Sequence, residues 1–290
     1  MRLVIFLLLS WLLSINMQAG PIRDMLQKRS TESKKMMDIA YGSDKRQRMD
    51  VYLPDNPKDA PIILMVHGGA WSMGDKRMSA VVKNKAARWN KKGVIFVSTN
   101  YRLLPDADLL AQADDVANAL IYVQNHAASW GAATQKIILM GHSAGAHLVS
   151  LISSDPSRYS NLKRWLATVS LDSAVMDVSM MMSGKHFNFY DEAFGADTVY
   201  WEQVSPYHRL SSSAIPTLMV CSTERPDKPC LQAKHFEQKA KTLGVHTEIS
   251  SQALSHKEIN EELGLESAYT RRVEEFIGSF GIDLQFIVKE

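Results

Sequence analysis

One short stretch of the chain has the residue types and spacing of a serine nucleophile, namely Gly141-His142-Ser143-Ala144-Gly145. In a Gly-x-Ser-x-Gly turn the serine holds a strained backbone conformation between a strand and a helix, and its hydroxyl projects from the top of a sheet. The two glycines are needed because a Cβ atom there would collide where strand and helix pass closely. The pattern predicts nucleophilic attack by Ser143 on a carbonyl group; the alternative is a surface turn.

A second segment, His67-Gly68-Gly69-Ala70-Trp71, supplies the hydrogen-bond donors that such an attack requires. Small residues let the backbone N–H groups of Gly69 and Ala70 approach a substrate carbonyl closely. The N–H of Ala144, at the start of the helix after Ser143, is the third expected donor, and it points a helix N-terminus at the developing charge. The alternative is a plain Gly-Gly loop.

A serine hydroxyl also needs a histidine base, and the order Ser…acid…His directs the search to the last third of the chain. His256 follows the last expected strand, in a segment that we interpret as a loop. His235 falls within a helical pattern and His246 within a strand pattern, where structural roles are expected. His208 precedes any acid that follows the strand ending at Cys221. His256 is therefore the predicted base.

The acid that orients this histidine is expected after the strand ending at Cys221, where the sequence reads Ser-Thr-Glu-Arg-Pro-Asp-Lys-Pro. Asp227 is the preferred candidate because it lies in the loop ahead of the next helix. Glu224, which is nearer the strand end, is the alternative. Cys221 and Cys230 flank this loop; they form either a disulfide or two buried thiols, because spacing alone does not decide pairing. A disulfide would clamp the loop and fix the acid.

The elements that must position these residues alternate along the chain. Short, mainly apolar runs predict strands over 38–44, 47–53, 61–67, 93–99, 136–140, 166–171, 216–221 and 245–249. Apolar residues at helical spacing predict helices over 79–91, 112–130, 146–152, 231–243 and 269–280. Alternating strands and helices predict an α/β fold, with a mostly parallel central sheet covered by helices on both faces.

The connection from Asp172 to Arg209 is long for a link between two strands and rich in methionine and aromatic residues. Such adaptable side chains suit a short cap that acts as a lid or an acyl pocket. A small satellite core beneath a long loop is the alternative.

The composition of the chain excludes several classes of function. The 290 residues are 46% hydrophobic and 22% charged with a net charge of +2, which indicates one globular domain and no nucleic-acid partner. No Cys-x-x-Cys or His-Glu-x-x-His pattern occurs, so we expect neither a metal nor a cofactor. The oligomeric state is not encoded in any motif.

The N-terminus has the pattern of a secretory signal peptide. Arg2 precedes a run of apolar residues that is shorter than a membrane-spanning helix requires, and the small residue Ala19 stands at a suitable cleavage position. We expect residues 1–19 to be a signal peptide, residues 20–290 to be the folded domain, and the mature protein to be exported without stable membrane insertion. A retained N-terminal anchor is the alternative, because Met17 is large for its position relative to such a site.

Several motifs together resemble the α/β-hydrolase superfamily, and in particular its esterase/lipase-like group, which includes hormone-sensitive-lipase-type carboxylesterases, feruloyl-esterase-like proteins and kynurenine formamidases. The motifs are Tyr41-Gly42 with Asp50-Val51-Tyr52-Leu53-Pro54, the 67–71 segment, Asn100-Tyr101-Arg102-Leu103, the 141–148 segment, and His256 with Ile259-Asn260. The resemblance implies Ser143 as nucleophile, His256 as base and the 67–71 loop with Ala144 as oxyanion hole. The family commonly has Gly-x-x-Asp where this chain has Cys-Ser-Thr-Glu-Arg-Pro-Asp.

These observations predict an exported serine esterase acting on small to medium acyl esters. An amidase-like formamidase or deacetylase with the same triad is one alternative, because the motif does not specify the leaving group. A non-catalytic binding module on the same fold is another, although such modules usually lack the serine or the histidine.

Overall fold

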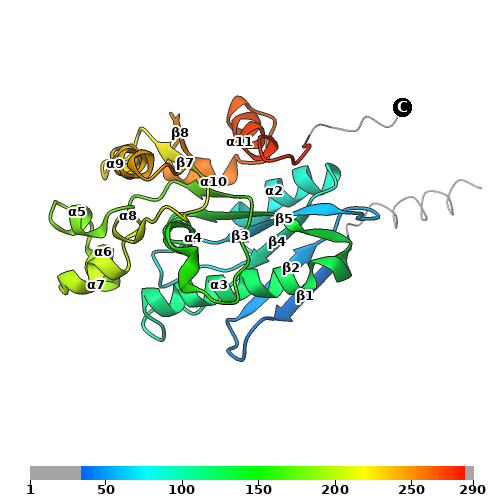
Figure 1. The fold of residues 1–290 in the computed structure, drawn as a ribbon, viewed down its shortest axis with the longest axis horizontal. Coiled ribbons are helices and arrows are strands. Elements are labelled where there is room, and N and C mark those ends of the chain that lie inside the picture. The colour runs from blue at the N-terminus through cyan, green and yellow to red at the C-terminus, as the bar shows by residue number, and fades with distance from the viewer. Residues whose placement is uncertain (1–33, 285–290) are drawn as a thin grey trace, which may run out of the picture. The chain divides into compact units, whose positions relative to one another are not determined.

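The computed structural model describes residues 34–284, which form one unit around a central sheet of eight strands (Figure 1). The strand order is β1-β2-β4-β3-β5-β6-β7-β8. The strands are β1 (Lys35–Ala40), β2 (Arg48–Tyr52), β3 (Ala60–Val66), β4 (Ile95–Thr99), β5 (Ala132–His142), β6 (Ala167–Leu171), β7 (Thr217–Ser222) and β8 (Thr247–Gln252). The expected signal peptide, residues 1–19, lies outside the described residues.

The sheet is parallel from β3 to β8 and antiparallel only where β1 pairs with β2 and β2 with β4. The central strands are almost fully buried because helices cover both faces, which explains their continuous apolar sequences. This arrangement confirms the predicted α/β class. It also brings the carboxyl ends of β3, β5, β6, β7 and β8 to one edge of the sheet.

Two apolar layers sandwich the sheet, and alternate residues of β3 belong to each of them. Ile62 and Leu64 pack into the layer that includes residues of α3 (Leu109–His126) and α4 (Ala144–Ser154). Ile63 and Met65 pack into the layer that includes residues of α2 (Ser79–Lys91) and α11 (Ala268–Gly278). The alternation follows from the two-residue period of a strand.

The remaining helices, apart from α9, are short. Two single turns, η1 (Ala127–Trp130) and η2 (Pro156–Arg158), follow α3 and α4, and α9 (Pro229–Thr242) connects β7 to β8. The cap between β6 and β7 consists of α5 (Val178–Met182), α6 (Asn188–Phe194), α7 (Thr198–Gln203) and α8 (Pro206–Arg209). The residues after β8 form α10 (His256–Glu261), which the sequence analysis interpreted as a loop.

The cap combines both functions considered from the sequence. Met181 and Phe194 are buried in the apolar layer that includes α3 and α4, and Met176 is buried in a smaller cluster with residues of α9. Phe187 and Met180 are exposed, and Phe187 also lines the cavity described below. One part of the segment therefore stabilises the cap, while another part faces the site.

The two cysteines are joined. A disulfide between Cys221 and Cys230 links the end of β7 to the first turn of α9, with a Cα–Cα distance of 5.1 Å. Of the two possibilities left open by the sequence, the structure has the bonded one. Among the described helices, none combines the length and apolar character needed to cross a bilayer.

Candidate active site

Ser143 occupies a strained turn at the end of β5. Its backbone has φ 56° and ψ −120°, a conformation that residues with a side chain rarely adopt, and α4 starts at the next residue. A Cβ atom on Gly141 would lie 2.3 Å from the carbonyl oxygen of Gly145, and one on Gly145 would lie 2.4 Å from that of Val66. The glycines of the motif are thus required by the close passage of α4 over β3 and β5.

The loop after β3 lies against this turn. A Cβ atom on Gly68 would be 2.8 Å from the Cβ of Ser143, so only glycine permits that contact. Gly69, Ala70 and Trp71 all have positive φ, which turns the loop sharply beside the serine. Among hydrogen bonds within residues 34–284, none uses the N–H groups of Gly69, Ala70 or Ala144. These are the three donors that the sequence assigned to an oxyanion hole.

Buried polar contacts hold this loop in place from the side of β1, β2 and β4. The backbone N–H of Lys76 donates to Oδ1 of Asn100 over 2.6 Å, and Nδ2 of Asn100 donates to Asp75 over 2.8 Å. Nζ of Lys76 lies 2.7 Å from Oδ1 of the fully buried Asp50. The motif residues Asp50 and Asn100 therefore act on the site indirectly, by fixing the loop that presents the donors.

Two further histidines of the motifs are structural. Burial lowers the pKa of His147 to about 4, so its ring is neutral; Nε2–H donates to the carbonyl of Val204, and Nδ1 accepts from the indole of Trp71. Burial likewise lowers the pKa of His67 to about 4, and its ring stacks on Tyr101 with centroids 4.6 Å apart. Both rings support the oxyanion loop and its surroundings.

His256 is the first residue of α10, where a capping box holds the helix start. The Ser255 hydroxyl accepts the N–H of Glu258, and the Glu258 carboxylate accepts the N–H of Ser255. His142 packs against His256, with ring centroids 4.5 Å apart, and its Nε2–H donates to the His256 carbonyl over 3.0 Å. Burial keeps the pKa of His142 well below its usual range, so the ring of His142 is neutral beside His256.

The carboxylate beside His256 belongs to Asp172, the residue that directly follows β6. Its Oδ2 is 2.6 Å from Nδ1 of His256, and its Oδ1 accepts the N–H of Ser222 over 2.7 Å. The side chain is fully buried, which raises its pKa. The hydrogen bond from His256 and the positive charge of Arg225 outweigh that effect, so the pKa of Asp172 lies below its ordinary value.

The structure places the two sequence candidates for the acid elsewhere. Asp227 pairs with Arg225 and accepts the hydroxyl of Tyr190 over 3.1 Å, and Glu224 is exposed; neither is hydrogen-bonded to His256 among the described contacts. The expectation followed the strand that usually precedes the acid, whereas the carboxylate in contact with His256 follows the neighbouring strand β6. One signal was present: Asp172 directly follows the predicted strand 166–171, at the same sheet edge as Ser143.

Ser143, Ala144 and His256 line one cavity of about 600 Å³ together with the oxyanion loop. Its other walls come from the segment before α2, from α2, from the cap and from α10. The apolar ones include Met73, Met78, Val81, Val175, Phe187, Phe189 and Tyr190, and α10 contributes the polar Lys257, Asn260 and Glu261. The arrangement combines a serine and a histidine at one cavity, a buried carboxylate on that histidine and three backbone N–H groups, which are the types of group that acyl transfer requires.

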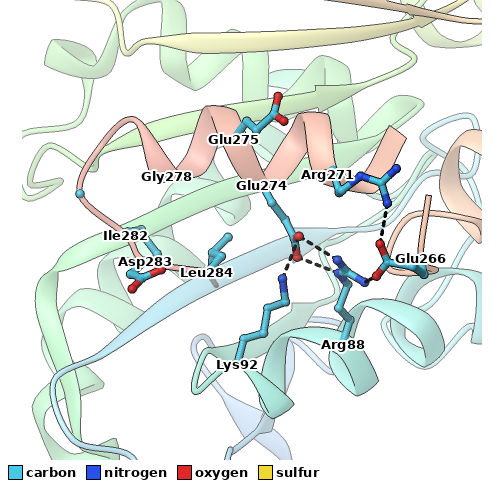
Figure 2. A pocket seen from close by; sticks show the side chains of 11 residues that line it. Arg88, Lys92, Glu266, Arg271, Glu274, Glu275, Gly278, Ile282, Asp283 and Leu284 are labelled. Carbon is cyan, nitrogen blue, oxygen red and sulfur yellow. Dashed lines mark hydrogen bonds and ion pairs between the residues drawn. The ribbon is translucent and has the colours of Figure 1, made fainter. Parts of the chain in front are cut away.

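A larger cavity, of about 820 Å³, lies between α2 and α11 (Figure 2). Its charged side chains pair with one another: Arg88 and Lys92 both bind Glu274, and Glu266 joins Arg88 to Arg271. None of its described lining residues is a serine, cysteine or histidine, so it offers no nucleophile or proton acceptor of the required kind. Within residues 34–284, no group of three or more acidic, histidine or cysteine residues is arranged to hold a metal ion.

Comparison with known proteins gives one family match. The family model BD-FAE matches residues 49–240, which include the oxyanion loop, the serine turn, Asp172 and Arg225. The match ends before His256. It therefore covers the sheet from β2 to β7 and the cap.

Curated relatives and solved structures agree with this match. The probable isoprenylcysteine alpha-carbonyl methylesterase ICME of Oryza sativa subsp. japonica is 32% identical over 113 residues, which are 39% of this chain and 27% of that protein. A kynurenine formamidase of Danio rerio is 32% identical over 127 residues, 43% of this chain and 41% of the other. The chain thus matches only about a quarter to two fifths of these relatives' lengths. A carbohydrate esterase from gut microbiota superimposes with a TM-score of 0.73 at 19% identity, covering 87% of this chain and 97% of that one, which shows a shared fold.

Proposed function

Because the chain belongs to the BD-FAE family and has the α/β-hydrolase fold, we propose that it is a serine carboxylesterase that hydrolyses small to medium acyl esters. In this proposal Ser143 is the nucleophile, His256 the base and Asp172 the acid, while Gly69, Ala70 and Ala144 form the oxyanion hole. The sequence-based choice of Asp227 is replaced by Asp172 on the basis of contact with His256.

One observation carries the proposal. The serine of the strained turn and His256 line the same cavity, and Nδ1 of that histidine is 2.6 Å from the buried carboxylate of Asp172. A buried carboxylate at Nδ1 favours the tautomer with a proton on that nitrogen, which leaves Nε2 free to accept a proton. A histidine with a purely structural role does not need to line the same cavity as a serine in a strained turn.

The reaction follows from these positions. Nε2 of His256 takes the hydroxyl proton as Oγ of Ser143 attacks the carbonyl carbon of the ester, and the three N–H groups stabilise the negative oxygen that forms. The protonated histidine then gives its proton to the departing alcohol, which leaves an acyl-serine. A water molecule, deprotonated by the same histidine, hydrolyses the acyl-serine and restores the enzyme.

The size and lining of the cavity support the substrate class. A space of about 600 Å³ with mostly apolar walls favours an ester with a short or medium apolar group over a large polar substrate. Phe187 and Phe189, whose rings stack with centroids 5.7 Å apart, form the wall that the cap contributes.

Formamide hydrolysis is a second candidate, favoured by the similarity to the Danio rerio kynurenine formamidase. The same nucleophile and base serve both reactions, and only the leaving group differs. Comparing turnover of a p-nitrophenyl ester with that of N-formyl-kynurenine on the same enzyme separates the two candidates, since the favoured substrate has the higher kcat/KM.

We also propose that the protein is exported after removal of residues 1–19. The disulfide supports this, because such bonds persist in oxidising compartments and are rare in the cytosol. Expression of the full chain followed by N-terminal sequencing of the exported protein tests the proposal. A mature chain that begins at Gly20 is the expected result, and an intact Met1 on an exported, membrane-bound protein would indicate a retained anchor instead.

The hydrolase proposal is tested with p-nitrophenyl acetate and butyrate on the purified protein. Ser143→Ala should reduce kcat by about 10⁵- to 10⁶-fold, as loss of the nucleophile does in serine proteases. A fluorophosphonate should label wild-type protein on Ser143 and leave the variant unlabelled. Ser129→Ala, at an exposed serine on η1, is the matched control and should retain full activity.

Two outcomes would contradict the proposal. Undiminished hydrolysis by Ser143→Ala would show that another group attacks the ester. A folded wild-type protein that neither hydrolyses these esters and formamides nor reacts with the phosphonate would indicate a binding module on the hydrolase fold.

A further inference from the structure

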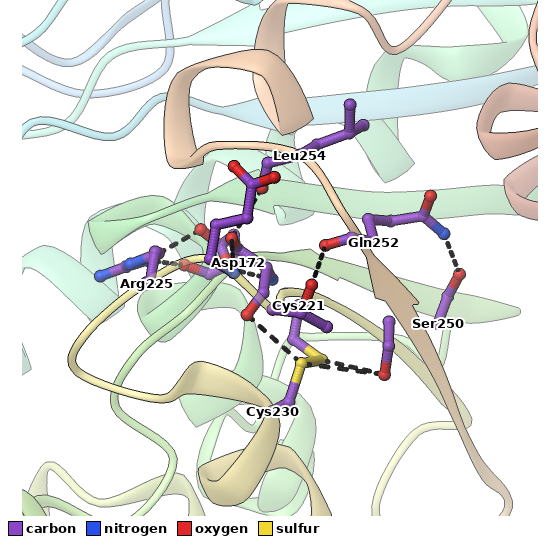
Figure 3. The surroundings of a disulfide bond; sticks show 11 residues. Asp172, Cys221, Arg225, Cys230, Ser250, Gln252 and Leu254 are labelled. Carbon is purple, nitrogen blue, oxygen red and sulfur yellow. Dashed lines mark hydrogen bonds and ion pairs between the residues drawn. A yellow bond between two sulfur atoms is a disulfide. The ribbon is translucent and has the colours of Figure 1, made fainter.

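Arg225, in the loop between β7 and α9, lies beside Asp172 (Figure 3) and contacts His256 and Asp227 as well. Its Nη1 is 2.9 Å from Oδ2 of Asp172 and 2.8 Å from Nδ1 of His256. Its Nε donates to Oδ1 of Asp227 over 2.9 Å, and Nη2 donates to Oδ2 of the same residue. No step of the proposed reaction uses this side chain, so its placement requires another explanation.

The donors of Arg225 divide between two aspartates. Nε and Nη2 bind Asp227 as a two-pronged fork, a geometry that guanidinium and carboxylate groups match well. The two hydrogens of Nη1 are matched by two acceptors on Asp172, its Oδ2 and its backbone carbonyl, each 2.9 Å away. The side chains of Asp172 and Asp227 are 0% and 3% exposed, so both carboxylates depend on these partners.

The same contacts govern the proton on His256. Nδ1 can either donate a proton or accept one, but it faces an acceptor on Asp172 and a donor on Arg225. Because Asp172 can absorb both hydrogens of Nη1, Arg225 need not donate to the ring, and Nδ1 keeps its proton. Only that tautomer leaves Nε2 able to receive a proton from Ser143.

Asp227 is held away from this role. Both of its oxygens are occupied by Arg225, and Oδ2 also accepts the hydroxyl of Tyr190, a residue of the cap that lines the cavity. The carboxylate that the chain carries where related proteins commonly have their acid is therefore bound by an arginine two residues earlier. It serves as an anchor for that arginine.

We propose that Arg225 is a positioning residue that assigns the acid role to Asp172, by holding the Asp172 carboxylate against Nδ1 of His256 and retaining Asp227 in its own fork. This inference rests on the proposed serine hydrolase function. It adds Arg225, which lines the cavity, and Asp227, which holds Arg225, to the residues on which turnover depends.

The disulfide fits this role because it fixes both ends of the loop that carries Arg225. Cys221 is the penultimate residue of β7, near Asp172, and Cys230 lies in the first turn of α9 (Figure 3). Joining these two residues restricts the conformations that the loop between them can adopt. In this proposal the bond helps to hold Arg225 in contact with Asp172 and His256.

The test compares Arg225→Met, Arg225→Lys and Asp227→Asn with Asp172→Asn and with a control, Arg209→Met, which breaks a partly buried arginine–aspartate pair outside the cavity. Arg225→Met should lower kcat by about 10- to 100-fold with KM changed less than about threefold, because the misplaced base affects the reaction more than binding. Lysine should fail to restore the rate, since one ammonium group cannot hold both carboxylates. Asp172→Asn should lower kcat by about 10⁴-fold, and Asp227→Asn should lower it far less. The control should leave kcat unchanged.

A pH profile and an NMR signal distinguish positioning from general loss of structure. Arg225 helps to keep the pKa of Asp172 low. As pH is lowered, kcat/KM of Arg225→Met should therefore begin to fall at a higher pH than that of wild type. The low-field proton signal of Nδ1–H should persist in wild type and Asp227→Asn, vanish in Asp172→Asn, and shift in Arg225→Met. This signal is read without turnover, so an inactive wild type would overturn the proposed function and leave the Arg225 inference testable.

Either of two results overturns the inference. One is a folded Arg225→Met variant with kcat within twofold of wild type and an unmoved Nδ1–H signal. The other is an Asp227→Asn variant as impaired as Asp172→Asn, which would show that Asp227 is itself the acid.

Discussion

At the scale of single residues, the serine turn requires positions without a Cβ atom. Gly145 is the second residue of α4, where a side chain would normally be accommodated, yet it faces the carbonyl oxygens of Val66 and His67. A Cβ atom would meet those oxygens at 2.4 and 2.5 Å. Because these are backbone atoms of β3 and the residue after it, they cannot move without displacing the oxyanion loop.

Gly145→Ala should therefore destabilise the protein by about 1–3 kcal/mol or more, as overpacking does, and should also lower kcat because the loop after β3 shifts. Urea unfolding and p-nitrophenyl acetate hydrolysis measure the two effects. Gly278→Ala is the matched control: nothing lies within 4 Å of a Cβ atom there, and alanine favours a helix, so stability should be unchanged or rise by up to about 1 kcal/mol. Equal effects of the two substitutions would contradict the steric explanation.

At the scale of elements, α10 is too short to be stable alone, and other elements bind its carbonyl groups. His142 donates to the carbonyl of His256, and Tyr269 donates to that of Ile259 over 2.9 Å. Lys85 of α2, which is fully buried, donates to both the backbone carbonyl and, over 3.0 Å, the side-chain oxygen of Asn260. The helix that carries the base is thus tied to the helix that follows the oxyanion loop.

Lys85→Met should lower the free energy of unfolding by about 2–4 kcal/mol, since it leaves buried carbonyl oxygens without donors. Burial lowers the pKa of Lys85 to about 7 from its ordinary value of 10.5. Between these values the unfolded chain binds a proton that the folded chain does not, so this group's contribution to stability rises with pH and is lost as pH falls from 10.5 to 7. The stability difference between wild type and Lys85→Met should accordingly widen from pH 7 to pH 9.

Urea unfolding of both proteins at pH 7, 8 and 9 measures this difference. Lys83→Met is the control, because Lys83 is exposed on the same helix, and it should change stability by less than about 0.5 kcal/mol at each pH. A pH-independent difference for Lys85→Met would show that the amine does not titrate in this range.

Elements with strong periodicity were predictable from the sequence, and short ones were not. Seven of the strands and the helices α2, α3, α4, α9 and α11 lie close to where apolar runs and helical spacing predict them, whereas β1 covers Lys35–Ala40 and shares only three residues with the predicted strand 38–44. The helix α10 was missed, although Ser255 and Glu258 carry the spacing of a capping box. The short cap helices depend on tertiary packing of residues such as Phe194, which local sequence does not encode.

The same contrast holds for the site. Ser143, the oxyanion loop and His256 lie in motifs or directly beyond strands, so their meeting at one sheet edge was predictable from chain order. Asp172 and Arg225 were not, because their roles depend on which of two neighbouring loops reaches the histidine. That choice is decided by side-chain contacts between segments about 50 residues apart, such as the pair Arg225 and Asp172.

At the scale of the whole molecule, the disulfide joins β7 to α9 and so connects the stability of the sheet to the site. Replacing both cysteines by serine should lower the free energy of unfolding by about 2–4 kcal/mol. It should also lower kcat at temperatures where the variant is fully folded, because the loop carrying Arg225 gains freedom. Thermal unfolding and ester hydrolysis at 25 °C measure the two effects. A variant that loses stability but keeps wild-type kcat would show that the disulfide has no effect on the site.

Because the strands from β3 to β8 run parallel, their carboxyl ends lie at one edge of the sheet and their amino ends at the other. Only the first edge carries the site, so the second tolerates attachments better. Every residue of the proposed reaction lies at or beyond the carboxyl end of a strand, whereas the turn at 243–246 precedes β8 and lies at the opposite edge. Gly244 in that turn has φ 68° and nothing within 4 Å of a Cβ position. A fluorescent protein, an affinity handle or a solid support attached there should leave the entrance to the cavity open, so the enzyme can be immobilised by its back edge and still turn over ester from solution.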